Sequence, residues 1–232
     1  MYIYILDLLF MILFSFVFLR NQTEKGKKVF LFFSFLIFAM TIGLRGTGTG
    51  EDTEMYVNIF NRVENISWSE LFGGNYRTVY SVDQYGYKNK VETAFLILCK
   101  FVSLFTSNAY VFLLCVATIT CALFAKFIYD NSHNIFFATY IFVCESTFMY
   151  AFNATRQYLA IAIGIQTYSL LKQKKIWSAI IMVILAVLVH GASIVFIVLF
   201  PLMLIKPHYK YKYFKYIMIG CALVPLMLPL IR

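Results

Sequence analysis

Hydrophobic residues occur along the chain in long runs that are separated by short polar links. The runs cover residues 2–19, 29–44, 91–107, 109–129, 135–152, 156–171, 174–205 and 216–231. A helix needs about 20 mostly apolar residues to cross the hydrocarbon core of a bilayer, and several runs reach or approach that length. The pattern predicts an all-α polytopic membrane protein, with one integral membrane domain over residues 1–232.

Three of the polar links are basic, and they predict the orientation of the chain. They are RNQTEKGKK from Arg20, KQKK from Lys172 and KPHYKYKYFK from Lys206. Short basic loops of membrane proteins lie on the cytoplasmic side. All three links can do so only if one run before Lys172 does not cross. Run 91–107 is short and carries a lysine, so we expect a re-entrant or interfacial helix on the outer face.

Run 174–205 is too long for one ordinary crossing, because a single helix of this length would extend about 48 Å. The segment VHGAS at 189–193 offers a polar break in its middle. We expect two short spans that meet near His190 on the outer side, which gives about eight membrane helices plus the re-entrant one. The loop 45–90, Glu92, Arg156 and His190 then all lie at the external face.

The composition agrees with a membrane protein. Hydrophobic residues make up 61% of the chain and charged residues only 13%, whereas about a quarter of a soluble domain is charged. The first run has no basic segment before it and no small-residue cleavage site, so it is predicted to be a membrane helix rather than a signal peptide. The net charge of +9 is assigned to cytoplasmic loops, and no nucleic-acid partner is expected.

The loop after the second run concentrates negative charge. Seven of the eleven acidic residues lie between Arg45 and Glu92. The loop opens with LRGTGTGEDTEMY, whose glycines lack the G-K-[ST] ending of a phosphate-binding loop and are predicted to form a flexible exit from the helix. Asp52 is predicted to cap a helix that carries Tyr56 and Phe60 at i+4 and i+8.

The segment MYAFNATRQYLA, residues 149–160, places polar side chains among apolar ones. Six polar or small residues share one face of a continuous helix: Asn153, Arg156, Gln157, Ala160, Gly164 and Thr167. A lone arginine at a membrane boundary can extend to lipid headgroups. An arginine between two amides favours an anion instead, and the planar guanidinium suits phosphate.

Two further ionisable residues lie inside apolar runs. An ionisable side chain in a membrane segment is a functional hypothesis by default, and His190 can take or give a proton near neutral pH. Glu145 is expected to have a structural role, as the partner of a cation such as Arg156. The chain has no Ser-His-Asp order, HExxH or DxD pattern, and the cysteines have no metal-type spacing, so neither metal nor cofactor is expected.

Four segments, in order, resemble the EpsG-like, Wzy-type bacterial polysaccharide polymerases: LRGTGTGEDTEMY, ETAF, NATRQYLA and LVHGAS. The residues that match the family patterns are Arg45, Asp52, Thr53 and Tyr56; Glu92 and Phe95; Asn153, Arg156, Gln157, Leu159 and Ala160; and His190 and Ser193. Ala94 replaces a glycine of the second pattern, and Ala192 and Ser193 are transposed relative to the fourth. The resemblance covers roughly residues 40–205. Family members usually continue for several more helices, so a C-terminally truncated chain is expected.

The resemblance implies a glycosyltransferase of GT-C-like architecture. Such an enzyme joins oligosaccharide repeat units carried on undecaprenyl diphosphate, at the outer face of the bacterial cytoplasmic membrane, with a flippase and a chain-length regulator as possible partners. The leaving diphosphate needs a fixed cation without a metal, and the attacking hydroxyl needs a proton acceptor. The expected catalytic residues are His190, Glu92 and Asp52, and the expected substrate-binding residues are Arg156, Arg45, Gln157, Asn153 and Tyr56.

Three other classes of protein fit parts of the pattern. A membrane-bound O-acyltransferase also uses a histidine in an apolar setting, and it would transfer label from an acyl donor rather than from a lipid-linked sugar. A transporter would carry charges along a path through the bilayer, whereas here they gather at one face. A non-catalytic truncated membrane protein would need none of these residues for activity.

Overall fold

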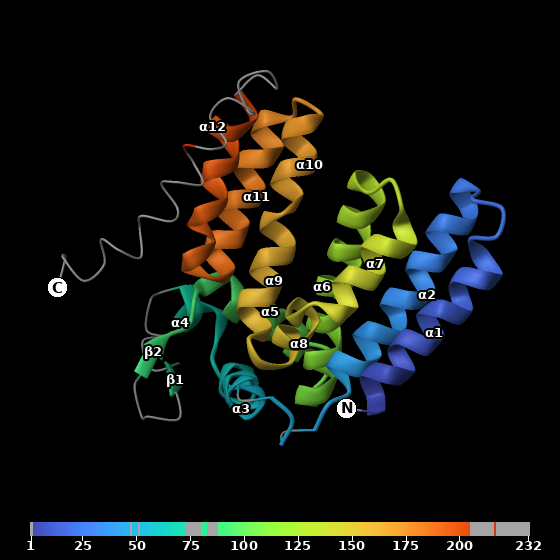
Figure 1. Cartoon of the computed structure of the whole chain (residues 1–232). Helices are drawn as coiled ribbons and strands as arrows, with labels where there is room; N and C mark the ends of the chain where they lie inside the picture. The colour runs from blue at the N-terminus through green and yellow to red at the C-terminus, as the bar shows by residue number, and fades with distance from the viewer. Residues whose placement is uncertain are drawn as a thin grey trace. The chain divides into compact units, whose positions relative to one another are not determined.

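The computed structural model describes residues 2–46, 48–50, 52–72, 80–82, 88–204 and 216. Its contacts divide the chain into two units, 1–196 and 197–232. The helices of the first unit are α1 (Tyr2–Phe18), α2 (Glu24–Gly43), α3 (Thr53–Glu64), α4 (Trp68–Phe72), α5 (Thr93–Ser103), α6 (Ala109–Asn131), α7 (Ile135–Cys144), α8 (Ser146–Asn153), α9 (Thr155–Gly164), α10 (Gln166–Lys172) and α11 (Ile176–Val189) (Figure 1). A 3-10 helix, η2 (Gly191–Val198), starts in this unit, and α12 (Leu199–Leu204) lies in the second.

One short hairpin departs from the predicted all-α fold. Strand β1 (Tyr80–Val82) pairs with β2 (Lys88–Lys90) in antiparallel register, with Tyr80 opposite Lys90. Both strands lie in the segment 45–90, which was predicted to be a loop. In the sequence TVYSVDQYGYKNK there, aromatic and β-branched residues stand on both sides of a glycine, and such a pattern indicates a hairpin.

Helices α2 and α6 form the longest contact in the first unit. Among the described residues, these two are the helices both long enough and apolar enough to cross a membrane. Their 20 and 23 residues correspond to about 30 and 35 Å. Their backbones lie close together at Gly43, where a Cβ atom would lie 2.6 Å from the Cα of Leu114. A larger residue at this position would push the helices apart.

The remaining helices are shorter than the predicted spans. Run 135–152 is interrupted at Glu145, where the backbone is extended with ψ 151° and α7 gives way to α8. A second interruption at Ala154, with ψ 56°, separates α8 from α9. The continuous helix face predicted from Asn153 to Thr167 is therefore wrong, because Asn153 belongs to α8 and Arg156 to α9. The predicted run 216–231 lies outside the described residues apart from Tyr216.

The predicted break at VHGAS is confirmed. Helix α11 ends at Val189, His190 is extended with φ −154° and ψ 116°, and the 3-10 helix begins at Gly191. Helix α5 has 11 residues, about 17 Å, which is too short to cross a bilayer. This length fits a re-entrant or interfacial helix, and its depth in the membrane stays a prediction.

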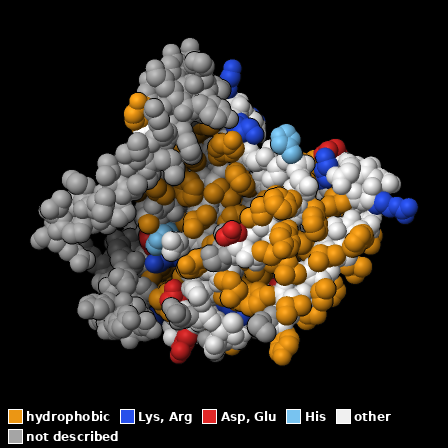
Figure 2. Space-filling model, in the orientation of Figure 1, with side chains coloured by type: hydrophobic (Ala, Val, Ile, Leu, Met, Phe, Trp, Pro, Cys, Tyr) orange, Lys and Arg blue, Asp and Glu red, His pale blue; other side chains and the backbone are white. Residues whose placement is uncertain are grey.

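Helix α1 exposes hydrophobic side chains and buries a charged one, which is the opposite of a helix on the surface of a soluble protein. Ten of its large hydrophobic side chains are exposed, whereas its aspartate, Asp7, is buried and accepts a 2.9 Å hydrogen bond from Thr41 of α2. Figure 2 shows hydrophobic side chains spread continuously over the region of α1, α2 and α7. Exposed apolar surface on this scale is typical of contact with lipid.

The buried residues form two clusters. One joins α1, α2, α6, α7 and α8 to one side of α9. The other packs aromatic residues of α3, α5 and α6 against α9 and the end of α11, with Phe60, Phe95 and Phe112 fully buried. The second cluster fixes the relative positions of α5, α9 and α11, and these are the three helices whose ends carry Glu92, Arg156 and His190.

Candidate functional site

Glu92, Arg156 and His190 meet in space although they are far apart in the sequence. The Oε2 atom of Glu92 lies 2.9 Å from Nη1 of Arg156, and its Oε1 atom lies 3.4 Å from Nδ1 of His190. Oε1 also accepts a 2.9 Å hydrogen bond from the backbone N–H of Gly191. Each oxygen of one carboxylate therefore holds a different functional group, and Glu92 is the centre of the cluster.

Helix ends position all three side chains. Glu92 is the N-cap of α5, with extended backbone at φ −70° and ψ 145°, and it is flanked by buried Val91 and Phe95. Arg156 lies in the first turn of α9, directly after the break at Ala154. His190 is the residue that ends α11. Since each side chain stands where a helix starts or stops, packing of the helices brings the side chains together.

Arg156 is mostly buried and has donor capacity to spare. Its side chain is 11% exposed, compared with 25% for Glu92 and 23% for His190. Within the described part of the chain, neither Nε nor Nη1 of Arg156 has a hydrogen-bond partner; Nη1 is close to Glu92 but is not aligned for a hydrogen bond. Buried polar groups are normally hydrogen-bonded, so the N–H group of Nε, which takes no part in the ion pair with Glu92, is available to an acceptor that enters the site.

Arg45 is also buried, but its donors are used by the protein. Nε donates to Thr53 Oγ1 (2.8 Å), Nη1 to the carbonyl of Ile42 (2.7 Å) and Nη2 to Thr155 Oγ1 (2.6 Å). Burial lowers the pKa of Arg45 to about 10, which leaves it charged near neutral pH. Arg45 thus links the end of α2 to the starts of α3 and α9. Its partner on α9, Thr155, directly precedes Arg156.

Tyr56 joins the same region from α3. Its hydroxyl accepts a long hydrogen bond, 3.4 Å, from the backbone N–H of Arg156, and its ring contacts Phe95 edge-on with centroids 5.7 Å apart. Burial raises the pKa of Tyr56 to about 12, so the phenol is neutral at physiological pH. The predicted helix that carries Tyr56 and Phe60 is confirmed, and both side chains are buried.

The other predicted site residues lie at the ends of neighbouring helices. Asp52 holds the predicted N-cap position of α3, although its side chain makes no capping hydrogen bond. Asn153 is half-buried at the end of α8, and Gln157 is exposed on α9. The ion-pair partner of Arg156 is Glu92, whereas Glu145, predicted to pair with such a cation, is exposed at the break between α7 and α8.

Residue types alone did not single out Thr155. Its hydroxyl accepts from Arg45 and its neighbour is Arg156, so it couples the two arginines.

A cavity of about 460 Å³ lies beside Arg45. It is lined by Ile3, Tyr4, Met40, Thr41, Leu44, Arg45, Thr49 and Phe152. Among the described residues, no group of three His, Cys, Asp or Glu side chains could hold a metal ion.

The lipid-type surface and the apolar helices define an integral membrane protein with a partly buried Arg–Glu–His cluster at helix ends. Residues 28–231 match the EpsG family, and the chain belongs to that family. The family associates the protein with polysaccharide biosynthesis in a membrane, and the matched region includes every predicted site residue. No curated protein and no solved structure matches the chain.

Proposed function

We propose that this protein is a polysaccharide polymerase of the bacterial cytoplasmic membrane, with its site at the outer face. It transfers an oligosaccharide from undecaprenyl diphosphate to an acceptor hydroxyl on another lipid-linked repeat unit. The observation that carries this proposal is the mostly buried guanidinium of Arg156, which lies beside Glu92 and His190 and whose Nε has no hydrogen-bond partner within the described residues. Membership of the EpsG family supports the substrate class.

The reaction forms one bond and breaks one. The oxygen of the acceptor hydroxyl bonds to the anomeric carbon of the donor sugar, and the proton of that hydroxyl passes to a base on the protein. The bond from the anomeric carbon to the phosphate oxygen breaks, and undecaprenyl diphosphate leaves with the bonding electrons. The site therefore needs a base on one side of the anomeric carbon and a cation on the other.

Arg156 supplies the cation in this proposal. A guanidinium binds phosphate oxygens with two parallel hydrogen bonds, and a fixed charge stabilises the leaving diphosphate as its negative charge develops. Glu92 fixes the guanidinium through Nη1. Arg45 acts through position, because its donors hold Thr155 and the start of α9. Tyr56, Asn153 and Gln157 lie around Arg156 as candidate contacts for diphosphate and sugar.

His190 supplies the base. Its Nδ1 faces Glu92, and a neutral imidazole with its proton on Nδ1 leaves Nε2 free to accept a proton. The separation of 3.4 Å is loose, as is common for catalytic pairs before substrate binds. Asp52 is the alternative base. A flippase would deliver the lipid-linked units to this face, and a chain-length regulator would set the size of the product.

The test exchanges Arg156 for lysine, which keeps the charge but loses the planar fork. Membranes that contain the protein and lipid-linked repeat units are assayed for polymer on gels. Arg156→Lys is expected to lower polymer formation at least about 100-fold, with single lipid-linked repeats accumulating at unchanged protein level. Arg62→Lys, on the exposed side of α3, is the matched control and keeps wild-type polymer.

Two results would contradict the proposal. Polymer of normal length and amount from Arg156→Lys would mean that Arg156 only anchors the protein to lipid headgroups. Wild-type protein that leaves the lipid-linked sugar untouched, but moves label from an acyl donor to a glycan, would identify an O-acyltransferase instead.

A further inference from the structure

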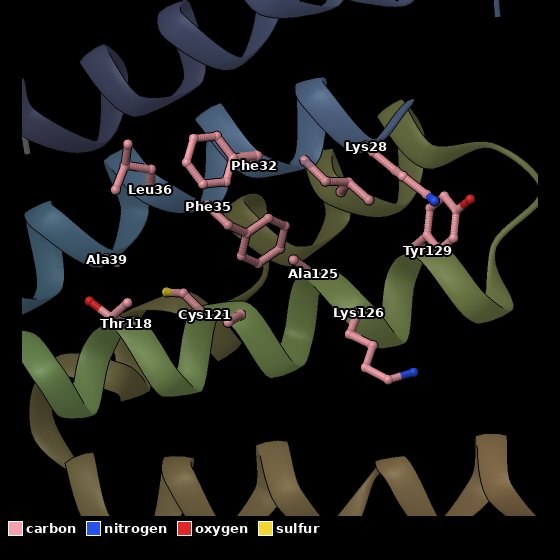
Figure 3. A pocket seen from close by; sticks show the side chains of 12 residues that line it. Lys28, Phe32, Phe35, Leu36, Ala39, Thr118, Cys121, Ala125, Lys126 and Tyr129 are labelled. Carbon is pink, nitrogen blue, oxygen red and sulfur yellow. The ribbon is translucent and has the colours of Figure 1, made fainter. Parts of the chain in front are cut away.

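An apolar groove between α2 and α6 lies away from the Arg156 cluster. It encloses about 380 Å³ and is shown in Figure 3. Its floor is buried and its walls are exposed: Leu31, Phe35, Ala39 and Cys121 are at most 4% exposed, whereas Phe32 is 62% and Leu36 40% exposed. A long hydrophobic chain placed in this groove would touch apolar atoms on three sides.

The close contact of the two helices at one end creates the groove. Gly43 and Leu114 bring the backbones together, and the groove begins one turn away, at Ala39 and Thr118. From there it runs eleven residues along each helix, to Lys28 on α2 and Tyr129 on α6. Eleven residues correspond to about 17 Å, close to half of the roughly 30 Å hydrocarbon core of a bilayer. The groove is therefore about one leaflet deep.

Basic and aromatic side chains stand at the open end of the groove. Lys28 and Lys126 flank it on opposite helices. The Nζ atom of Lys28 lies 5.3 Å from the centre of the Tyr129 ring, and the Tyr129 hydroxyl donates to Glu24 (2.9 Å). Lys126 pairs with Asp130 on the surface. A tyrosine with lysines at this depth is typical of the headgroup level of a membrane.

We infer that this groove binds an anionic glycerophospholipid, with an acyl chain along α2 and α6 and its phosphate between Lys28 and Lys126. An acyl chain that spans one leaflet matches the length of the groove. At the open end, Lys28 faces the Tyr129 ring and Lys126 pairs with Asp130, and these two ammonium groups are the cations that a negative headgroup would contact. The inference does not rest on the proposed function.

The occupant is distinct from the lipid-linked sugar. Lys28 precedes Arg45 by 17 residues, and along a helix this corresponds to about 26 Å. Arg45, at the other end of α2, holds Thr155, which directly precedes Arg156. A lipid whose diphosphate binds at Arg156 would therefore have its headgroup at that other end of α2. The groove thus faces the other leaflet, which is the cytoplasmic one if the site is external.

The test measures lipid binding to the purified full chain by native mass spectrometry. Phosphatidylglycerol and phosphatidylcholine with identical acyl chains are titrated separately. Wild-type protein is expected to bind phosphatidylglycerol about tenfold more tightly, and Lys28→Gln with Lys126→Gln is expected to remove that preference. The matched control, Lys174→Gln with Lys175→Gln, removes two exposed lysines at the same end of the bundle and keeps the preference.

A second variant tests the apolar part of the groove without changing its charge. Ala122 is exposed and lines the groove, so Ala122→Trp fills the groove without disturbing the buried core. It is expected to lower phosphatidylglycerol binding about tenfold with an unchanged unfolding midpoint. Equal binding of both lipids to wild-type protein, unchanged preference in the double lysine variant, or unchanged phosphatidylglycerol binding in the tryptophan variant would overturn the inference.

Discussion

Arg45 and Arg156 lie beside each other, joined through Thr155, yet their surroundings differ. Arg45 is 5% exposed and donates hydrogen bonds from Nε and both terminal nitrogens to the chain itself. Arg156 faces one carboxylate and keeps two buried nitrogens without a hydrogen-bond partner within the described residues. The first guanidinium holds the protein together, and the second has capacity left for a substrate.

The comparison shows that charge and motif membership do not by themselves identify a substrate contact. Both arginines belong to segments that resemble the family patterns, and both were predicted to bind diphosphate. The number of donors already used by the protein separates them. Because every nitrogen of Arg45 already donates to the chain, we expect Arg45 to contribute to stability and Arg156 to activity.

The largest expected effect is that of Arg45→Met on stability. Methionine fills similar volume but leaves the hydroxyls of Thr53 and Thr155 and the carbonyl of Ile42 without their donor. Hydrogen bonds to a charged group contribute about 1.5–3 kcal/mol each, so the free energy of unfolding is expected to fall by about 3–5 kcal/mol. Denaturant unfolding in micelles measures this loss.

The matched variant is Arg156→Met in the same assay. It is expected to lower the free energy of unfolding by less than half as much, since the guanidinium lacks those bonds, while polymer formation is lost. Equal destabilisation by the two variants would remove the distinction between the arginines.

An intermediate effect is expected from Thr155→Val. Valine has nearly the shape of threonine but cannot accept the hydrogen bond from Nη2 of Arg45, which is then left buried and unpaired. The free energy of unfolding is expected to drop by about 1–3 kcal/mol. Thr155→Ser, which keeps the hydroxyl, is the control and is expected to recover most of the loss. A valine variant as stable as wild type would show that Arg45 does not depend on this bond.

The smallest effect is expected from Tyr56→Phe. The lost hydrogen bond is 3.4 Å long, near the limit of such an interaction, and the buried ring stays in place against Phe95. The free energy of unfolding is expected to change by less than about 1 kcal/mol. A larger drop would mean that the hydroxyl, rather than Arg45, positions the start of α9.

Some of this architecture could be predicted from sequence. The break at His190 was visible because a histidine, a glycine and a serine interrupt an apolar run, and the helix α3 was visible from Asp52 as its cap and from the spacing of Tyr56 and Phe60. The placement of the basic links predicted that Glu92, Arg156 and His190 lie at the same face of the membrane. It gave no distances between these residues.

Other features left no local signal. Residues 149–160 contain neither proline nor glycine, so the break at Ala154 could not be distinguished from a continuous helix. The choice of Glu92 rather than Glu145 as the partner of Arg156 depends on how α5 packs against α9 and α11, which is a tertiary property. The role of Thr155 likewise depends on a guanidinium that lies 110 residues earlier.

The central position of Glu92 also determines when the cluster can form during synthesis of the chain. Its carboxylate accepts from Gly191, which is 99 residues further along the chain. Ribosomes add about 5–20 residues per second, so on the order of 5–20 s pass between the synthesis of the two. Arg156 is added within that interval, whereas His190 and Gly191 are added only at its end. The cluster is therefore completed late in biogenesis, and a chain that stops before α11 can form the Glu92–Arg156 pair but lacks both partners of Oε1.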